Sequence, residues 1–210
     1  MDSFLDSTVI INYFEYNYKI GELKKKCFDY VEFSKGKILT SFIVQDEVRR
    51  VILKRKEMYG CILRKVKDPS YEITYNENIK FLNKEDIKFT HGLYLKLKDK
   101  SINNLEEDFG SEIVFLNASL RLFLRKRINE ISITKSDLDS SVLSIIHDFI
   151  DDFADCRVLT SAIQIQQNKE IFFFVTADQH FDPNGYNFIK TEPKLENYKF
   201  PNLKNFLYED

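Results

Sequence analysis

Apolar positions along the chain follow two patterns, short unbroken runs and longer stretches with helical spacing. The runs at residues 4–5, 38–40 and 171–175 are typical of buried strands, and the last of them is the clearest. They lack the strict alternation of apolar and polar residues that is typical of a strand with one solvent-exposed face, which favours parallel strands covered on both sides. We therefore expect an α/β fold in which a parallel sheet is flanked by helices.

Helical spacing dominates the rest of the chain. It predicts helices over residues 22–33, 42–59, 105–131 and 137–167. Ser41 is a suitable N-cap for the second of these helices. The third is apolar nearly all round from 113 to 124, so we expect this part to be buried. The fourth is too long without a cap, and a break near 150–154 is expected.

The middle of the chain departs from this alternation of strands and helices. From about residue 60 to 104 the pattern blurs, although residues 71–75 alternate as a strand does. Residues 186–190 are expected to form a last strand. We interpret residues 1–210 as a single domain with an insertion at about 60–104.

Composition narrows the class of protein. The chain has 210 residues, 43% hydrophobic and 30% charged, which excludes a wholly disordered chain. A net charge of −2 argues against coating nucleic acid by bulk electrostatics. The three cysteines lie far apart, which favours free thiols in a reducing compartment. No apolar stretch is long enough to span a membrane, and the start lacks the basic region of a secretory signal, so we expect a cytoplasmic protein without membrane partners.

Several common catalytic motifs are absent from the sequence. There is no phosphate-binding P-loop, no dinucleotide-binding glycine fingerprint and no nucleophile elbow. His91, His147 and His180 form no H-x-x-x-H pair, which disfavours a zinc hydrolase. Carboxylates are therefore the main candidates for chemistry.

Four acidic residues stand in positions where acids are unusual. Asp6 and Asp178 each follow an apolar run, and would lie at the carboxyl edge of a parallel sheet, where ligands bind. Glu47 and Asp155 share helix faces with apolar residues. Four carboxylates directed towards a core are costly unless a positive group joins them, and Mg²⁺ or Mn²⁺ suits bare oxygens best.

Each acid alone has a simpler interpretation. Asp6 could cap a turn or helix, Asp155 could be a helix N-cap, and Asp178 could begin a loop. Glu47 could form an ion pair with Arg49 or Arg50. The order and surroundings of the four acids together, rather than any single residue, indicate a metal site.

Two further acids could join the site. Glu112 begins a stretch expected to be buried and is followed by Leu116 one turn later, so it competes with Asp155 for the third position. Asp155 is preferred because one helix and one strand connect it directly to Asp178. Asp182 is a candidate extra ligand, with a turn before Pro183 as the slightly favoured alternative.

Four segments in order resemble the PIN domain family of metal-dependent ribonucleases. They are residues 4–11, 41–48, 155–162 and 174–181, and residues 188–193 are similar to the closing strand of the family. The resemblance implies a three-layer PIN-like fold and an endoribonuclease that hydrolyses RNA phosphodiesters with Mg²⁺ or Mn²⁺. It assigns catalytic and metal-binding roles to Asp6, Glu47, Asp155 and Asp178, with Ser7 and Thr176 orienting the carboxylates or metal-bound water.

The chain departs from the family pattern in two ways. Thr8 stands where the family often has Asn, and the long middle segment exceeds the compact toxin members, so toxin status is not implied. A catalytically silent PIN-like scaffold that binds RNA or protein is the alternative function. A phosphatase of the haloacid-dehalogenase type is disfavoured, because Thr8 occupies the position of its second Asp.

Basic residues offer a route for RNA along the helix that carries Glu47. Arg49, Arg50 and Lys54 follow Glu47 and are candidates for phosphate contacts, although a solvated helix face is the favoured interpretation of these charges. Besides RNA, an antitoxin-like or other protein and a second copy of the chain are candidate partners.

Overall fold

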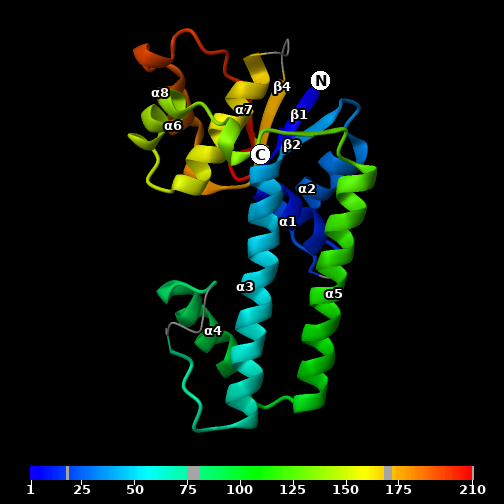
Figure 1. Cartoon of the computed structure of the whole chain (residues 1–210). Helices are drawn as coiled ribbons and strands as arrows, with labels where there is room; N and C mark the ends of the chain where they lie inside the picture. The colour runs from blue at the N-terminus through cyan, green and yellow to red at the C-terminus, as the bar shows by residue number, and fades with distance from the viewer. Residues whose placement is uncertain (18, 75–80, 168–171, 210) are drawn as a thin grey trace. The chain divides into compact units, whose positions relative to one another are not determined.

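The computed structural model describes residues 1–17, 19–74, 81–167 and 172–209 and divides the chain into two compact units (Figure 1). The first unit comprises Met1–Val48 and Leu122–Asp210, and the second comprises Arg49–Arg121. The four acids expected to bind metal all belong to the first unit.

One parallel sheet forms the centre of the first unit. Among the described residues, its strands follow the order β3-β2-β1-β4-β5, and every neighbouring pair is parallel. The strands are β1 (Asp2–Leu5), β2 (Ile38–Ser41), β3 (Glu130–Ser132), β4 (Phe172–Thr176) and β5 (Asn202–Asn205). The prediction of a parallel sheet flanked by helices is confirmed.

Helices cover both faces of this sheet. They are α1 (Ser7–Glu15), α2 (Glu22–Phe33), α6 (Ser140–His147), α7 (Phe153–Gln167) and α8 (Pro183–Lys190), with ends of α3 (Phe42–Lys67) and α5 (Ile102–Lys126). Right-handed crossovers from β1 to β2 and from β3 back to β4 require helices on opposite faces. Figure 1 accordingly shows α1 and α2 on one side of the sheet and α6, α7 and α8 on the other.

The strand order creates a switch point between β1 and β4. The chain moves from β1 outward to β2 and β3, and then returns to the other side of β1 to form β4 and β5. The connections leave the sheet in opposite directions at this place, and in open α/β sheets ligands commonly bind beyond the carboxyl ends of strands at such a point. The fold therefore provides a natural ligand-binding position next to these two strands.

The apolar runs supply the core of the first unit, as expected for strands covered on both faces. Phe4, Leu5 and Phe174 are completely buried, and all four residues of β2 are buried. Ser41 Oγ accepts a hydrogen bond from the backbone N–H of Val44 at 3.3 Å, which confirms its predicted role as the cap of α3.

The second unit is helical in its described part. It contains most of α3 and α5 together with α4 (Lys84–Leu97), which begins with a reciprocal cap between Asn83 and Asp86. The Tyr59 ring stacks on the Phe109 ring at 4.0 Å, and this pair forms part of a buried cluster between α3 and α5. The predicted insertion at 60–104 lies within this unit, which begins earlier and ends later.

Four predictions about secondary structure and burial are wrong. The helix predicted to run to residue 131 ends at Lys126, and Glu130–Ser132 form β3. Residues 186–190 belong to helix α8, because Asp182 caps the helix and Pro183 suits its first turn. Residues 71–74 form no strand, and Tyr75 lies outside the described residues. The stretch from 113 to 124 is not buried throughout, since Val114 is 70% exposed and Leu122 is 52% exposed.

The lengths of the described helices also bear on membranes. No helix in the described ranges is both long enough and apolar enough to cross a bilayer.

Candidate metal centre

The ends of β1 and β4 bring Asp6 and Asp178 to the switch point. The two strands are in register from Asp2 opposite Phe172 to Leu5 opposite Val175. Asp6 directly follows β1 and its backbone N–H still bonds to the carbonyl of Val175 at 3.0 Å. Asp178 follows β4 by two residues, so both acids lie at the same edge of the sheet.

Asp6 is the most deeply buried acid of the group, with 3% of its surface exposed. Its Oδ1 accepts the backbone N–H of Ser7 at 2.5 Å, and its Oδ2 accepts the hydroxyls of Thr8 and Thr176, each at 2.7 Å. Burial raises the pKa of Asp6, and the charge of Asp178 adds to this, while the three hydrogen bonds oppose it. The carboxylate is thus held in one orientation by the first residues of α1 and the last residue of β4.

Asp155 and Asp178 approach each other through His180. Asp155 lies in the first turn of α7, and its Oδ2 is 2.7 Å from His180 Nδ1, which is also 3.1 Å from Oδ1 of Asp178. The Oδ2 of Asp155 makes no hydrogen bond of good geometry with a described residue, although His180 Nδ1 lies 2.7 Å away. The backbone N–H of His180 also bonds to Asp178 Oδ1 at 2.9 Å.

Burial and repulsion between carboxylates raise the pKa of Asp155. Burial is the largest cause, followed by the charges of Asp178, Asp6 and Asp152, and the pKa reaches about 7 although His180 lowers it. A carboxyl group in this position is costly to ionise unless a cation lies nearby.

Glu47 completes the group from the second turn of α3. Burial raises its pKa to about 8, with further contributions from the charges of Asp6, Asp155 and Asp152, and a hydrogen bond with Ser7 lowers it. Its Oε1 is buried without a hydrogen-bond partner among the described residues. Glu47 therefore carries an oxygen that the surrounding protein leaves unsatisfied.

These features fit a hard divalent cation. Two buried carboxylate oxygens, Glu47 Oε1 and Asp155 Oδ2, lack hydrogen-bond donors in the described part of the chain. Ligand atoms of Asp155, Asp178 and His180 lie within 4.8 Å of one another, a spacing that one ion can bridge. Oxygen-rich donor sets of this kind suit Mg²⁺ or Mn²⁺, and a cation would remove the repulsion that raises the two pKa values.

The structure places Asp155 and Asp178 side by side with His180, and Asp6 and Glu47 lie near enough for acidic neighbours to raise their pKa values. Among the described residues, the set of ligand atoms within 4.8 Å of one another includes Asp155, Asp178 and His180 but not Asp6 or Glu47. Mutual electrostatic effects connect all four carboxylates. Ser7 bonds to Asp6 and Glu47, and Thr176 bonds to Asp6, so both touch the carboxylates that they were expected to orient.

The two alternative acids have other roles. Glu112 lies in the second unit, where its Oε1 accepts a hydrogen bond from Arg55 at 3.0 Å. Asp182 caps α8, and its Oδ1 accepts the backbone N–H groups of Asn184 and Gly185, each at 3.0 Å. Asp155 is therefore the acid that lies next to Asp178, while Glu112 pairs with Arg55 in its own unit, and Asp182 has the turn role that was its favoured alternative.

The candidate phosphate contacts lie in the second unit. Arg49 and Arg50 are exposed, and Lys54 forms an ion pair with Asp86 at 2.9 Å. The ion pair weakens the case for Lys54 as an RNA ligand and leaves Arg50 as the best candidate for testing.

Sequence reasoning missed His180 and the positive role of Thr8. In the sequence His180 belongs to no H-x-x-x-H pair, but its place two residues after Asp178 is compatible with a contact across the turn. Thr8 Oγ1 donates to Asp6 and accepts the backbone N–H of Ala177 at 3.0 Å. Thr8 therefore connects the ends of β1 and β4.

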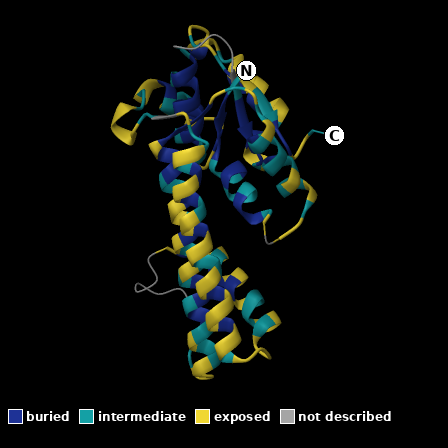
Figure 2. Ribbon diagram, turned by 90° about the vertical axis from the view of Figure 1, so that its right-hand side faces the viewer, coloured by how far each residue is buried: buried dark blue, intermediate teal, exposed yellow. Residues whose placement is uncertain are grey.

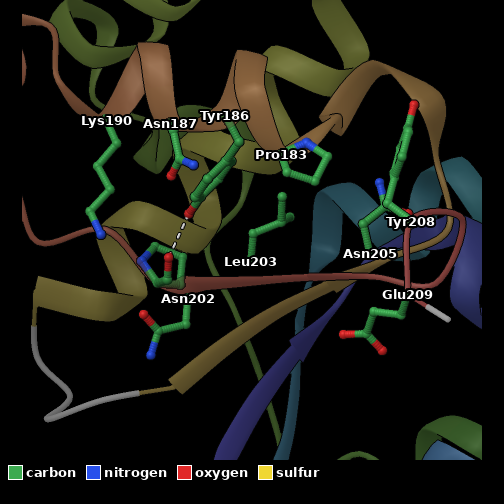
Figure 3. A pocket seen from close by; sticks show the side chains of 10 residues that line it. Pro183, Tyr186, Asn187, Lys190, Asn202, Leu203, Asn205, Tyr208 and Glu209 are labelled. Carbon is green, nitrogen blue, oxygen red and sulfur yellow. Dashed lines mark hydrogen bonds between the residues drawn. The ribbon is translucent and has the colours of Figure 1, made fainter.

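A separate pocket lies between α8 and β5 and is distinct from the acidic group (Figure 3). It has a volume of about 260 Å³ and includes Tyr186, whose hydroxyl donates to the carbonyl of Pro201 at 2.7 Å. Asn205 lines this pocket and donates through Nδ2 to the carbonyl of Asp178 at 2.7 Å. Asn205 thus helps to fix the turn that carries Asp178, and none of the four acids lines the pocket.

Comparison with known proteins gives no further indication of identity. No protein-family model, no curated protein and no solved structure matches the chain.

Proposed function

We propose that the chain is a PIN-like, Mg²⁺- or Mn²⁺-dependent endoribonuclease. The observation that carries this proposal is the convergence of four carboxylates at the switch point of a parallel sheet, two of them with pKa values raised to about 7 and 8. An arrangement of this type costs stability in the absence of a cation, which argues for a functional role rather than a structural one.

Some residues of such a site would bind the cation, and others orient the carboxylates. Asp6 and Asp178 would hold the cation from the two strand ends, and Glu47 and Asp155 from the two helices. Thr8, Thr176 and Ser7 keep the carboxylates in place through hydrogen bonds. A bound Mg²⁺ would activate water at neutral pH and neutralise the charge that develops on a phosphodiester.

RNA is favoured as the substrate by the segment resemblance to PIN domains. Exposed Arg49 and Arg50 follow Glu47 in the same helix and provide cations for a phosphate backbone. Arg50→Ala is expected to weaken RNA binding at every sequence and to reduce the salt slope of binding by about 1, without changing metal affinity.

The direct test is cleavage of single-stranded RNA by purified protein. We expect cleavage with Mg²⁺ or Mn²⁺, none after chelation, and loss of activity in Asp178→Asn to the level of the chelated protein. Asp182→Asn is the matched control, because it makes the same change four residues away in a cap. Equal cleavage by the wild type and Asp178→Asn would refute the nuclease proposal, and RNA binding without cleavage would favour a silent scaffold.

A further inference from the structure

The outward face of α5 in the second unit has no helix packed against it among the described residues. Figure 2 looks onto this helix, whose outer side is exposed. Its exposed positions include Glu107, Gly110, Val114, Ala118 and Arg121, spaced three or four residues apart. This spacing places all five on one stripe of the helix, opposite the buried Leu105 and Leu116.

The stripe is symmetrical about Val114. Residues at equal distances on either side of it are similar in size, and the two charged residues are of opposite sign. Gly110 and Ala118 lie four residues on either side of Val114, and Glu107 and Arg121 lie seven residues on either side. Neither Glu107 nor Arg121 forms an ion pair with another described residue. A second copy of the same helix, running antiparallel, would match this stripe position for position.

An apolar groove adjoins the stripe. It lies between α3 and α5 of the second unit, has a volume of about 420 Å³, and includes Gly60, Gly110 and Val114 in its lining. A Cβ atom added at Gly60 or Gly110 would meet nothing within 4 Å. The groove thus leaves apolar surface open beside Val114, which is itself 70% exposed.

We propose that a second copy of the chain docks on this face, with the two α5 helices antiparallel and Val114 at the two-fold axis. In this arrangement Glu107 meets the partner's Arg121 and Gly110 meets the partner's Ala118. The small residues allow close approach of the helix axes, and the ion pair occurs twice because the interface is isologous. A parallel arrangement would instead place like charges together.

The charge pattern favours a second copy over other occupants. An RNA would be repelled by the exposed Glu107, which forms no ion pair with a described residue, whereas its neighbours Glu106 and Asp108 are paired with Lys67 and Lys100. The contact from residue 107 to 121 spans about 21 Å of helix, which is short for a permanent interface. We therefore expect a dimer whose population depends on protein concentration.

Sedimentation velocity over a concentration series tests this interface in the full chain. Arg121→Glu and Glu107→Arg are each expected to weaken the dimer by about tenfold or more, because like charges then meet twice. The double variant restores the pair with its signs exchanged and is expected to recover dimerisation. Lys96→Glu is the matched control, because Lys96 is exposed on α4 outside the stripe.

A cysteine at the axis gives an independent readout. The three native cysteines are buried, so Val114→Cys adds an accessible thiol opposite its own copy. Mild oxidation is expected to give a covalent dimer from Val114→Cys and not from Leu95→Cys, which is also exposed. A monomer at all concentrations, or a dimer that the single charge reversals leave unchanged, would overturn the proposal.

Discussion

Glu47→Gln is expected to stabilise the metal-free protein at high pH. The substitution keeps the size of the side chain and removes the charge whose Oε1 is buried without a donor among the described residues. The pKa of Glu47 is raised from an ordinary value of 4.5 to about 8, chiefly by burial. In the folded protein the group therefore remains protonated at a pH where the unfolded chain has already ionised.

The sign of the pH dependence follows from this difference. Between pH 4.5 and 8 the native state binds one more proton at Glu47 than the unfolded state, so the wild type loses stability as pH rises. If the whole difference between the two pKa values were realised, the loss of folding free energy would be about 5 kcal/mol, which is an upper bound. Because the side chain is partly exposed and its surroundings relax, the actual effect is expected to be smaller than this bound. We expect the free energy of unfolding of Glu47→Gln to exceed that of the wild type by about 1–3 kcal/mol above pH 8 and to equal it below pH 5.

Urea unfolding at pH 5, 7 and 9 in the presence of a chelator measures the effect. Glu22→Gln is the control in the same unit, because the Glu22 side chain is 87% exposed. Its variant is expected to unfold at about the same urea concentration as the wild type at every pH. Added Mn²⁺ is expected to stabilise the wild type more than Glu47→Gln, since a ligand that binds only the native state adds to its stability. A Glu47→Gln variant that is less stable than the wild type at pH 9 without metal would refute the reasoning.

Two further substitutions test how the site is held. Thr176→Val removes a hydroxyl that donates to Asp6 Oδ2 at 2.7 Å, so we expect urea unfolding to show a loss of about 1–3 kcal/mol in stability and Mn²⁺ binding to be weaker. Thr176→Ser keeps the hydroxyl and is expected to recover both properties. Unchanged Mn²⁺ binding by a folded Thr176→Val would contradict this. Asp182→Ala is expected to lower the free energy of unfolding by about 1 kcal/mol through loss of the α8 cap, and Asp182→Asn by less. Calorimetry is expected to show normal Mn²⁺ binding by Asp182→Asn. Loss of Mn²⁺ binding in this variant would instead indicate that Asp182 is a ligand.

The strands and the four acids could be predicted because local pattern and burial agree at these places. The run that ends at Val175 is apolar because both faces of β4 are covered, and an acid that follows such a run must lie at the sheet edge. Asp6 could be recognised for the same reason. The order of strands could not be predicted, because it depends on long-range pairing that the single sequence does not display.

The errors arise where short-range chemistry competes with apolar pattern. Residues 186–190 have the composition of a strand, but Asp182 and Pro183 begin a helix, and Tyr186 and Ile189 then face inward at helical spacing. Val114 has the composition of a core residue and yet is exposed on α5. His180 was missed because its contact with Asp155 depends on tertiary structure rather than on spacing.

A crystal of the full chain grown or soaked with Mn²⁺ tests the central claim most directly. The anomalous difference map is expected to show a peak within ligand distance of carboxylate oxygens of Asp6, Glu47, Asp155 and Asp178, and to lose it in Asp178→Asn crystals treated alike. A map in which Mn²⁺ binds elsewhere and leaves these four carboxylates without a cation would contradict the account.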